Sequence, residues 1–293
     1  MTRYRLRPAL FGAAVALVTL TAACGDSNAP TTGLSDEQTT ALALAVRDEV
    51  QSSASGLSVA GNVDPLARAA NAPSGALVMP CATPSSTTDS DGDGIPDDAS
   101  YVFTAANCTF TGYRGGTLTL SGGLEITDPT PHAAGFAYTA TLTGITATFD
   151  ASGQASDYTA IRSGLRSLDG TPTSLTLADS ASVQRTTGLG TAAIVRSWTV
   201  GFAPATPAAI NQPLPSGNFA VNGTMKWKRG AENYAITVTT KDSLQYDVTC
   251  TGTPQKIKAG ELRAAATYNG KDGYLRVVWS ACDKDPAFVF VEN

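Results

Sequence analysis

Alternation of apolar and polar residues, from Tyr101 to the C-terminus, is the feature that most limits how this chain can fold. A period of two residues is typical of β-strands with one buried face. The runs from Ile194 to Phe202 and from Leu244 to Cys250 show it clearly. About 11 to 14 such segments follow one another through short connections that carry turn residues. The pattern therefore predicts an all-β, antiparallel domain over residues 101–293.

A sheet with that many strands has to curl or split in order to bury its apolar face. We therefore expect a curved sheet, in the form of a half-barrel, a closed barrel or a sandwich. The alternation changes phase at Gly144, which predicts a β-bulge or bend inside one long strand. The stretch from Pro204 to Pro215 interrupts the pattern, so one β domain is favoured and two small domains are the alternative.

Residues 1–23 have the features of an export signal. Three arginines precede an uncharged apolar run, residues 9–20, that is too short for a membrane-spanning helix of about 20 residues. The run ends in Leu20-Thr-Ala-Ala-Cys24, which resembles a bacterial lipobox. The resemblance implies cleavage before Cys24 and anchorage of the lipidated cysteine in a membrane of the bacterial cell envelope. The same resemblance implies, from Gly25 in place of Asp after the cysteine, the outer membrane, facing the periplasm or the cell surface; an ordinary secretory signal is the alternative.

The segment between the signal and the β domain is rich in small residues. Residues 24–34 are expected to form a flexible tether. Ser35 then begins a helix, with Gln38 placed to complete a capping box. Residues 35–100 are thus predicted to hold one helix and a small-residue linker that ends in an acidic loop. An apolar stripe at helical spacing is predicted to pack against the β domain or against a partner: Leu42, Val46 and Val50.

The acidic loop carries the one recognisable site chemistry. Three aspartates stand at alternate positions before a glycine placed for a sharp turn: Asp89, Asp91, Asp93 and Gly94. Carboxylates this close repel one another unless a cation lies between them, and Ca²⁺ takes six to eight oxygen ligands. By position in the loop, the backbone carbonyl of Ile95 and the carboxylate of Asp97 would add to the set.

The same stretch resembles one calcium motif more than another. Ser100 stands where an EF-hand has its bidentate Glu, and Tyr101–Phe103 has the pattern of a strand, so an EF-hand is disfavoured. The stretch more closely resembles the thrombospondin type 3 calcium repeat, D-x-D-x-D-G-x-x-D, although one copy stands here where that family strings several together. The resemblance implies calcium as a cofactor; the alternative is a solvated Asp/Gly turn without an ion.

Four cysteines remain when Cys24 is lipidated, and an even number in an exported protein predicts two disulfides. No CxxC spacing supports a zinc site. Three connectivities are possible, and the favoured one pairs sequence neighbours: Cys81 with Cys108, around the acidic loop, and Cys250 with Cys282. The second pair ends the first and third strands of a predicted meander, which lie about 9.6 Å apart, beyond disulfide reach. Either the loops lean together or the third strand pairs elsewhere.

Composition and motifs narrow the classes of function. The chain has 25 acidic and 20 basic residues, and three of the basic ones are lost with the signal, which disfavours nucleic acid as a partner. Its one histidine, His132, lies in a Pro-rich turn, and no Gly-x-Ser-x-Gly motif accompanies it. The basic run Lys226–Arg229 alternates like an ordinary half-buried strand. The acids considered for glycosidase chemistry are Glu125, Glu232 and Glu261, although nothing in the sequence selects them.

These observations favour a non-enzymatic structural or interaction module on a lipid anchor, with a membrane and an envelope protein or lipid as partners. One alternative is a carrier of lipid or another apolar ligand, with the predicted helix lying across the opening of the curved sheet. The other is a glycan-directed hydrolase.

Overall fold

The computed structural model describes residues 36–54, 57, 81–111, 117–150, 157–188, 190–210, 212, 214–250, 256–268, 271–282, 284 and 286–293. These residues all belong to one compact unit, Gly33–Asn293. They form one helix, α1 (Asp36–Ala54), and twelve strands. The strands are β1 (Asp98–Phe103), β2 (Thr109–Thr111), β3 (Thr117–Thr127), β4 (Tyr138–Asp150), β5 (Tyr158–Thr171), β6 (Ser174–Thr187), β7 (Gly190–Pro204), β8 (Gly217–Arg229), β9 (Glu232–Tyr246), β10 (Ile257–Tyr268), β11 (Lys271–Trp279) and β12 (Ala287–Glu292).

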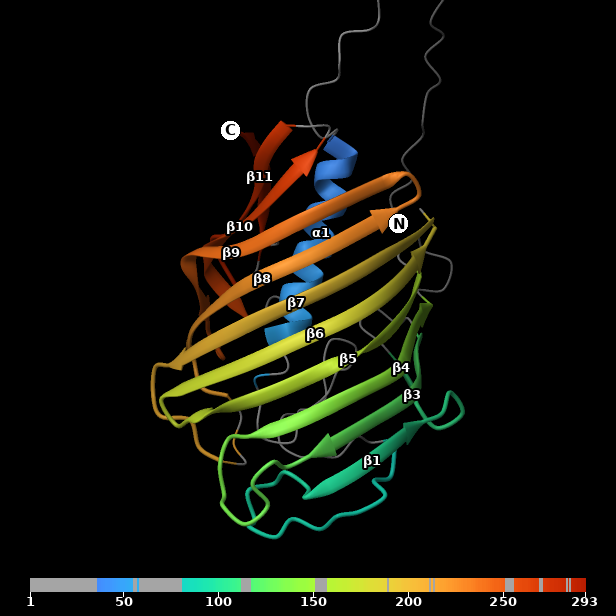
Figure 1. Cartoon of the computed structure of the whole chain (residues 1–293), viewed down its shortest axis with the longest axis vertical. Helices are drawn as coiled ribbons and strands as arrows, with labels where there is room; N and C mark the ends of the chain where they lie inside the picture. The colour runs from blue at the N-terminus through green and yellow to red at the C-terminus, as the bar shows by residue number, and fades with distance from the viewer. Residues whose placement is uncertain are drawn as a thin grey trace, which may run out of the picture. The chain divides into compact units, whose positions relative to one another are not determined.

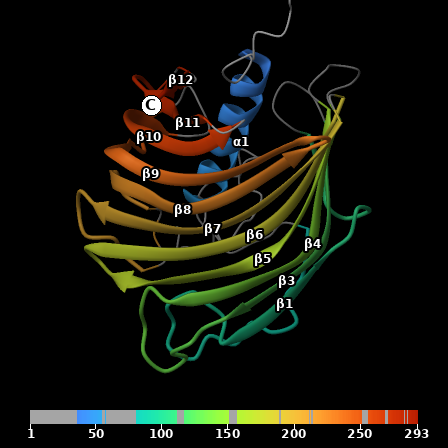
Figure 2. The same ribbon diagram turned by 45° about the horizontal axis from the view of Figure 1, so that its top comes forward.

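The strands make one antiparallel sheet in which neighbours in space are nearly always neighbours in sequence. The order is β1-β3-β4-β5-β6-β7-β8-β9-β10-β11-β12, and the short strand β2 also pairs with β3. The sheet bends strongly along its width (Figures 1 and 2). Among the described residues its edge strands β1 and β12 do not pair with each other, so the sheet is open. The predicted all-β, curved antiparallel sheet is confirmed, and the half-barrel is the alternative that describes it.

The proline-containing break after β7 does not divide the sheet. Strand β8 pairs with β7 over its whole length, from Ala192 opposite Arg229 to Pro204 opposite Gly217. The connection that follows Pro204 is therefore the loop of a long hairpin. One β domain, rather than two small ones, is the arrangement in the structure.

The phase shift at Gly144 is a bulge within the single strand β4, as predicted. The pairing of β4 with β5 shifts between Leu142 and Ile145, and the pairing with β3 shifts opposite, between Ser121 and Gly123. Gly144 has a φ of +56°, in the left-handed region that favours glycine. A side chain at Gly122, whose φ is +119°, would meet the carbonyl oxygen of Gly144 at 2.6 Å. Two glycines on facing strands thus permit the bend.

Helix α1 covers the inner, apolar face of the sheet (Figures 1 and 2). The predicted stripe of Leu42, Val46 and Val50 is completely buried, and α1 packs against β11 and β12. Inward residues of the strands complete the core, and alternation is most regular in β6, where Leu175 and Leu177 are fully buried between exposed neighbours. The helix therefore supplies the second layer that an open sheet needs to bury its inner face.

The outer face of the sheet carries hydroxyl groups in register. One row of threonines crosses six strands, from β2 to β7, and each member is paired with the next: Thr109, Thr119, Thr148, Thr159, Thr186 and Thr191. The hydroxyls of Thr186 and Thr191 lie 2.9 Å apart, within hydrogen-bond distance. Cross-strand threonine pairs of this kind stabilise a sheet and its register.

Candidate metal site

The structure brings together the first three aspartates of the acidic loop, which precedes β1. Asp89, Asp91 and Asp93 each offer a carboxylate oxygen, and these three atoms all lie within 4.8 Å of one another. That distance is about twice a Ca²⁺–oxygen bond of 2.3–2.6 Å, so one ion can contact all three. Carboxylate oxygens are the ligands that hard cations such as Ca²⁺ prefer, and the donor set fits the ion.

Backbone geometry fixes the first aspartate of this cluster. The two oxygens of Asp89 accept hydrogen bonds from the N–H groups of Gly92 and Gly94, both at 2.9 Å. Gly92 and Gly94 have φ angles of +75° and +88°, which residues with a Cβ rarely adopt. The glycines between the aspartates therefore allow the loop to fold back on its own first carboxylate, which is the sharp turn that the sequence predicted.

Asp93 is the buried member of the cluster. Only 1% of its surface is exposed, and its oxygens accept hydrogen bonds from the N–H groups of Ile95 at 2.8 Å and Gly135 at 3.2 Å. Burial raises the pKa of Asp93, these two hydrogen bonds oppose that effect, and the charges of Asp91 and Asp128 add to it. A nearby cation would remove this penalty on the ionised form.

Ile95 and Asp97 are placed differently from each other. The side chain of Ile95 is 1% exposed and belongs to the apolar core. The carboxylate of Asp97 accepts hydrogen bonds from the N–H group of Ser90 at 2.9 Å and from its hydroxyl at 2.6 Å. These bonds lower the pKa of Asp97. Asp97 thus closes the loop through Ser90 and is outside the group of three converging carboxylates.

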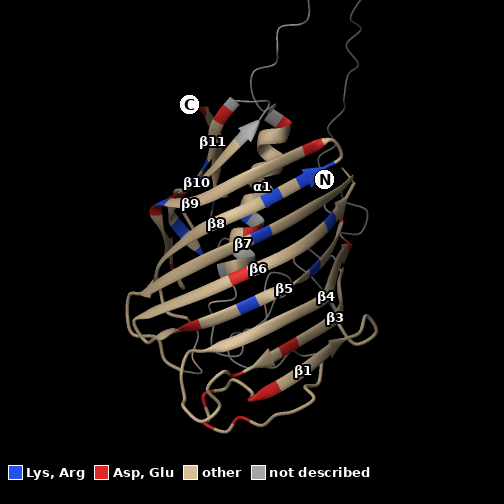
Figure 3. Ribbon diagram, viewed as in Figure 1, with Lys and Arg blue, Asp and Glu red and all other residues tan. Residues whose placement is uncertain are grey.

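Sequence reasoning missed a fourth acidic residue, Asp128, which follows β3 and is 6% exposed. The one feature of the sequence that could have pointed to it is the excess of acidic over basic residues in the long stretch around it. Residues 69–161 contain nine acidic residues and a single Lys or Arg, Arg114. Among the residues that the structure describes, Figure 3 shows acidic ones, and no basic ones, in the loops around β1. Side chains of opposite charge are therefore scarce in this part of the chain.

The residues considered for catalysis do not assemble into a site. His132 is exposed in the connection between β3 and β4. Five strands of the sheet separate Glu125 on β3 from Glu232 on β9. Glu261, on β10, lies between Arg263 at 2.9 Å and Arg276 at 2.6 Å, and Glu232 is paired with Arg229 at 3.2 Å.

The basic run on β8 has the two faces that alternation predicts. Met225 and Trp227 are buried, whereas Lys226 and Lys228 point outward and are exposed. Arg229 lies over the ring of Trp227, with its guanidinium carbon 5.4 Å from the ring centroid. The run is an ordinary half-buried strand end.

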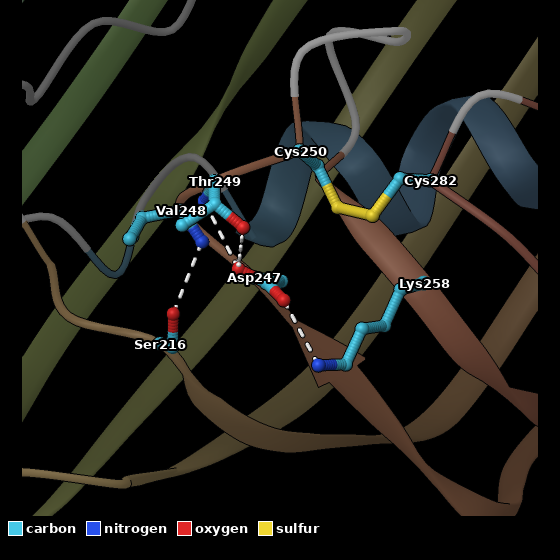
Figure 4. The surroundings of a disulfide bond; sticks show 7 residues. All are labelled: Ser216, Asp247, Val248, Thr249, Cys250, Lys258 and Cys282. Carbon is cyan, nitrogen blue, oxygen red and sulfur yellow. Dashed lines mark hydrogen bonds and ion pairs between the residues drawn. A yellow bond between two sulfur atoms is a disulfide. The ribbon is translucent and has the colours of Figure 1, made fainter.

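Both cysteine pairs lie at disulfide distance. The Cα atoms of Cys81 and Cys108 are 4.9 Å apart, and those of Cys250 and Cys282 are 5.3 Å apart. Strand β11 keeps its place beside β10, so the geometric difficulty of the second pair is solved by the loops, which lean together (Figure 4). Asp247 stabilises the turn before Cys250 by accepting hydrogen bonds from Thr249 and from Lys258, the latter at 2.9 Å.

A buried network of charges joins α1 to the sheet. Glu49, 4% exposed, contacts Arg162 of β5 at 3.0 Å and Arg196 of β7 at 2.6 Å. Arg196 also contacts Asp179 of β6 at 2.8 Å, and Asp179 lies 3.3 Å from Arg166. Burial alone raises the pKa of Asp179, but the charges of Arg166 and Arg196 outweigh burial and lower it to about 2. The sequence signal was the place of Arg196 among the inward residues of its strand.

Taken together, the described residues define a class of protein: an open, curved antiparallel sheet with a helix packed on its inner face and an acidic loop at one edge. No model of a known protein family, no curated protein and no solved structure matches this chain. In the part of the chain that the structure describes, α1 is not long and apolar enough to cross a membrane. The predicted lipidation site, Cys24, lies outside the described residues.

Proposed function

We propose that this chain is a lipid-anchored protein of the bacterial cell envelope that acts as a non-catalytic structural or interaction module, with a calcium ion stabilising the acidic loop. The observation that carries the proposal is the convergence of Asp89, Asp91 and Asp93 within 4.8 Å, with Asp93 almost fully buried. Three carboxylates held this close, with no basic partner among the described residues, are costly, and a divalent cation offsets that cost. The three glutamates considered for catalysis support the non-catalytic part of the proposal: Glu232 and Glu261 are paired with arginines, and five strands separate Glu125 from Glu232.

A carrier of apolar ligands has less support from the inner face of the sheet. The helix expected to close such a cavity is held by ion pairs from Glu49 to Arg162 and Arg196 and by the hydrogen bond from Gln38 to Glu232 at 3.0 Å. Buried side chains of α1 and charged groups of β5, β6 and β7 occupy the space beneath it. A glycan-directed hydrolase would need two acids about 5 to 10 Å apart in a cleft, and Glu125, Glu232 and Glu261 do not provide such a pair.

The calcium proposal predicts a metal-dependent melting temperature. With a dissociation constant on the order of 10⁻⁴ to 10⁻³ M, as in extracellular calcium modules, 10 mM Ca²⁺ should raise Tm by about 3 to 10 °C over the chelated protein. The double variant Asp91→Asn with Asp93→Asn should lose this increase, because two of three converging charges are removed. Scanning calorimetry of the mature chain, with and without chelator, measures both.

The matched control is Asp169→Asn, which removes one exposed carboxylate near the end of β5, outside the acidic loop. It should keep the full calcium-dependent increase. An equal Tm with calcium and with chelator in the unmodified protein would rule out an ion that matters for stability.

A further inference from the structure

Only one oxygen of the Asp128 carboxylate has a hydrogen-bond partner among the described residues. Its Oδ1 accepts hydrogen bonds from the N–H group of Thr130 at 2.7 Å and from the Thr130 hydroxyl at 3.4 Å, as aspartates do in turns. Its Oδ2 is buried and accepts no hydrogen bond from any residue that the structure describes. A buried oxygen of an ionised carboxylate is costly without a donor or a cation. A bound water molecule or a cation is the kind of partner that would satisfy Oδ2.

Backbone hydrogen bonds hold the segment of Asp128 against the acidic loop. The N–H group of Asp128 donates to the carbonyl of Asp97 at 3.1 Å. Further along the same connection between β3 and β4, the N–H group of Gly135 donates to Oδ2 of Asp93 at 3.2 Å. Asp128 also lies close enough to Asp93 for its charge to act on that carboxylate. Two segments, one before β1 and one after β3, therefore meet at the cluster.

Asp97, the residue that the loop motif assigns as a further ligand, already accepts hydrogen bonds from the protein. Both oxygens of Asp97 accept hydrogen bonds from Ser90, and Asp97 does not join the three converging carboxylates. Asp128 is more deeply buried than Asp97 and has an oxygen without a donor. These facts favour Asp128 over Asp97 as the next acidic group around a cation.

We propose that Asp128 is the fourth carboxylate of the metal site, joined to the calcium ion through a bound water molecule, so that the site spans both the acidic loop and the β3–β4 connection. The inference rests on the calcium site proposed above. The link runs through water because the carboxylate of Asp128 is not among those whose oxygens lie within 4.8 Å of one another. Calcium loops often reach one of their carboxylates in this way.

The test is calcium binding measured by isothermal titration calorimetry on the mature chain with Cys24→Ser and intact disulfides. Asp128→Asn should raise the dissociation constant about tenfold, the lower end of the effect of outer-shell groups on metal affinity. Asp97→Asn keeps an oxygen for Ser90 and should change it less than about twofold, since both oxygens of Asp97 are engaged by Ser90 and lie outside the three converging carboxylates. Asp91→Asn should abolish measurable binding.

The outcomes separate this inference from the proposed function. No calcium binding by the unmodified chain overturns both. Binding that is lost in Asp91→Asn but unchanged in Asp128→Asn overturns only the role of Asp128, and so does a larger loss in Asp97→Asn than in Asp128→Asn. Asparagine keeps the acceptor for Thr130, so the calcium-free fold should survive, which circular dichroism checks. Asp128→Ser, which also keeps a short acceptor, is the second variant if the first does not fold.

Discussion

At the scale of single residues, Glu49 shows how a charge is accommodated inside this protein. The residue lies on the buried side of α1, and its two oxygens reach arginines on two different strands, Arg162 and Arg196. Without Glu49, each of those arginines would remain charged beneath the helix and would have lost one ion-pair partner. Removing one member of a buried ion pair costs more than the pair itself contributes, because the remaining charge stays desolvated.

Glu49→Gln should therefore lower the free energy of unfolding by about 3 to 5 kcal/mol. The matched change on the same helix is Glu37→Gln, whose side chain is 77% exposed and lies 3.9 Å from Arg229. An exposed pair of this kind contributes little, so Glu37→Gln should cost less than about 1 kcal/mol. Urea unfolding of both variants measures the difference, and equal effects would show that the buried network does not hold α1 in place.

The residues of the candidate site were predictable only in part, for a physical reason. Asp89, Asp91 and Asp93 converge because a short loop folds on itself. The spacing of aspartates and glycines in the sequence predicts such local geometry. Asp128 and Glu49 meet their partners through the pairing of distant segments. Single-sequence patterns show which face of a strand a residue occupies, but not which residue lies opposite it.

At the scale of elements, the two disulfides offer a comparison within one molecule. They close loops of similar length, with sequence separations of 27 and 32 residues, so chain entropy gives each a similar effect of about 3.6 kcal/mol. Cys81–Cys108 encloses the acidic loop, whereas Cys250–Cys282 joins the loops that follow β9 and β11. The two disulfides should therefore contribute equally to the free energy of unfolding but differ in their effect on calcium affinity.

We expect Cys81→Ala with Cys108→Ala to weaken calcium binding, because the ends of the acidic loop are no longer fixed and ordering it costs more. Cys250→Ala with Cys282→Ala should leave calcium affinity unchanged. Both pairs of substitutions should lower the free energy of unfolding by about 3 to 4 kcal/mol. Urea unfolding in chelator and calcium titration of the folded variants separate the two effects; a similar loss of affinity in both would mean that general destabilisation is responsible.

The strands and the helix were easier to predict than the contacts between them. The number of strands, the helix with its buried stripe and the bulge at Gly144 all follow from periodicity, which is local. The proline-containing loop after β7 suggested a possible boundary between domains, and only the pairing of β7 with β8 decides the matter. The outcome for Cys250 and Cys282 also depended on how two loops lean, which no strand pattern encodes.

At the scale of the whole molecule, the proposed lipid anchor would set where the protein acts. Cys24→Ser removes the thiol that would carry the acyl chains, and the protein should move from the membrane fraction to the soluble fraction of a bacterial host with an outer membrane. Ser27→Ala, in the same predicted tether, should leave it membrane-bound. Cell fractionation and intact mass of the purified proteins measure the change. Unmodified protein without an acyl mass would favour an ordinary secretory signal.

The sheet order also bears on how the chain reaches its fold. From β3 to β12 every strand pairs with the one before it, so each step of growth closes a short hairpin instead of bringing together distant parts of the chain. Low contact order of this kind speeds the folding of β-proteins, because little loop entropy is lost before pairing is gained. Neither disulfide joins residues of the central strands β4 to β8. These hairpins can assemble while the thiols are still reduced, and oxidation then fixes a register that is already complete.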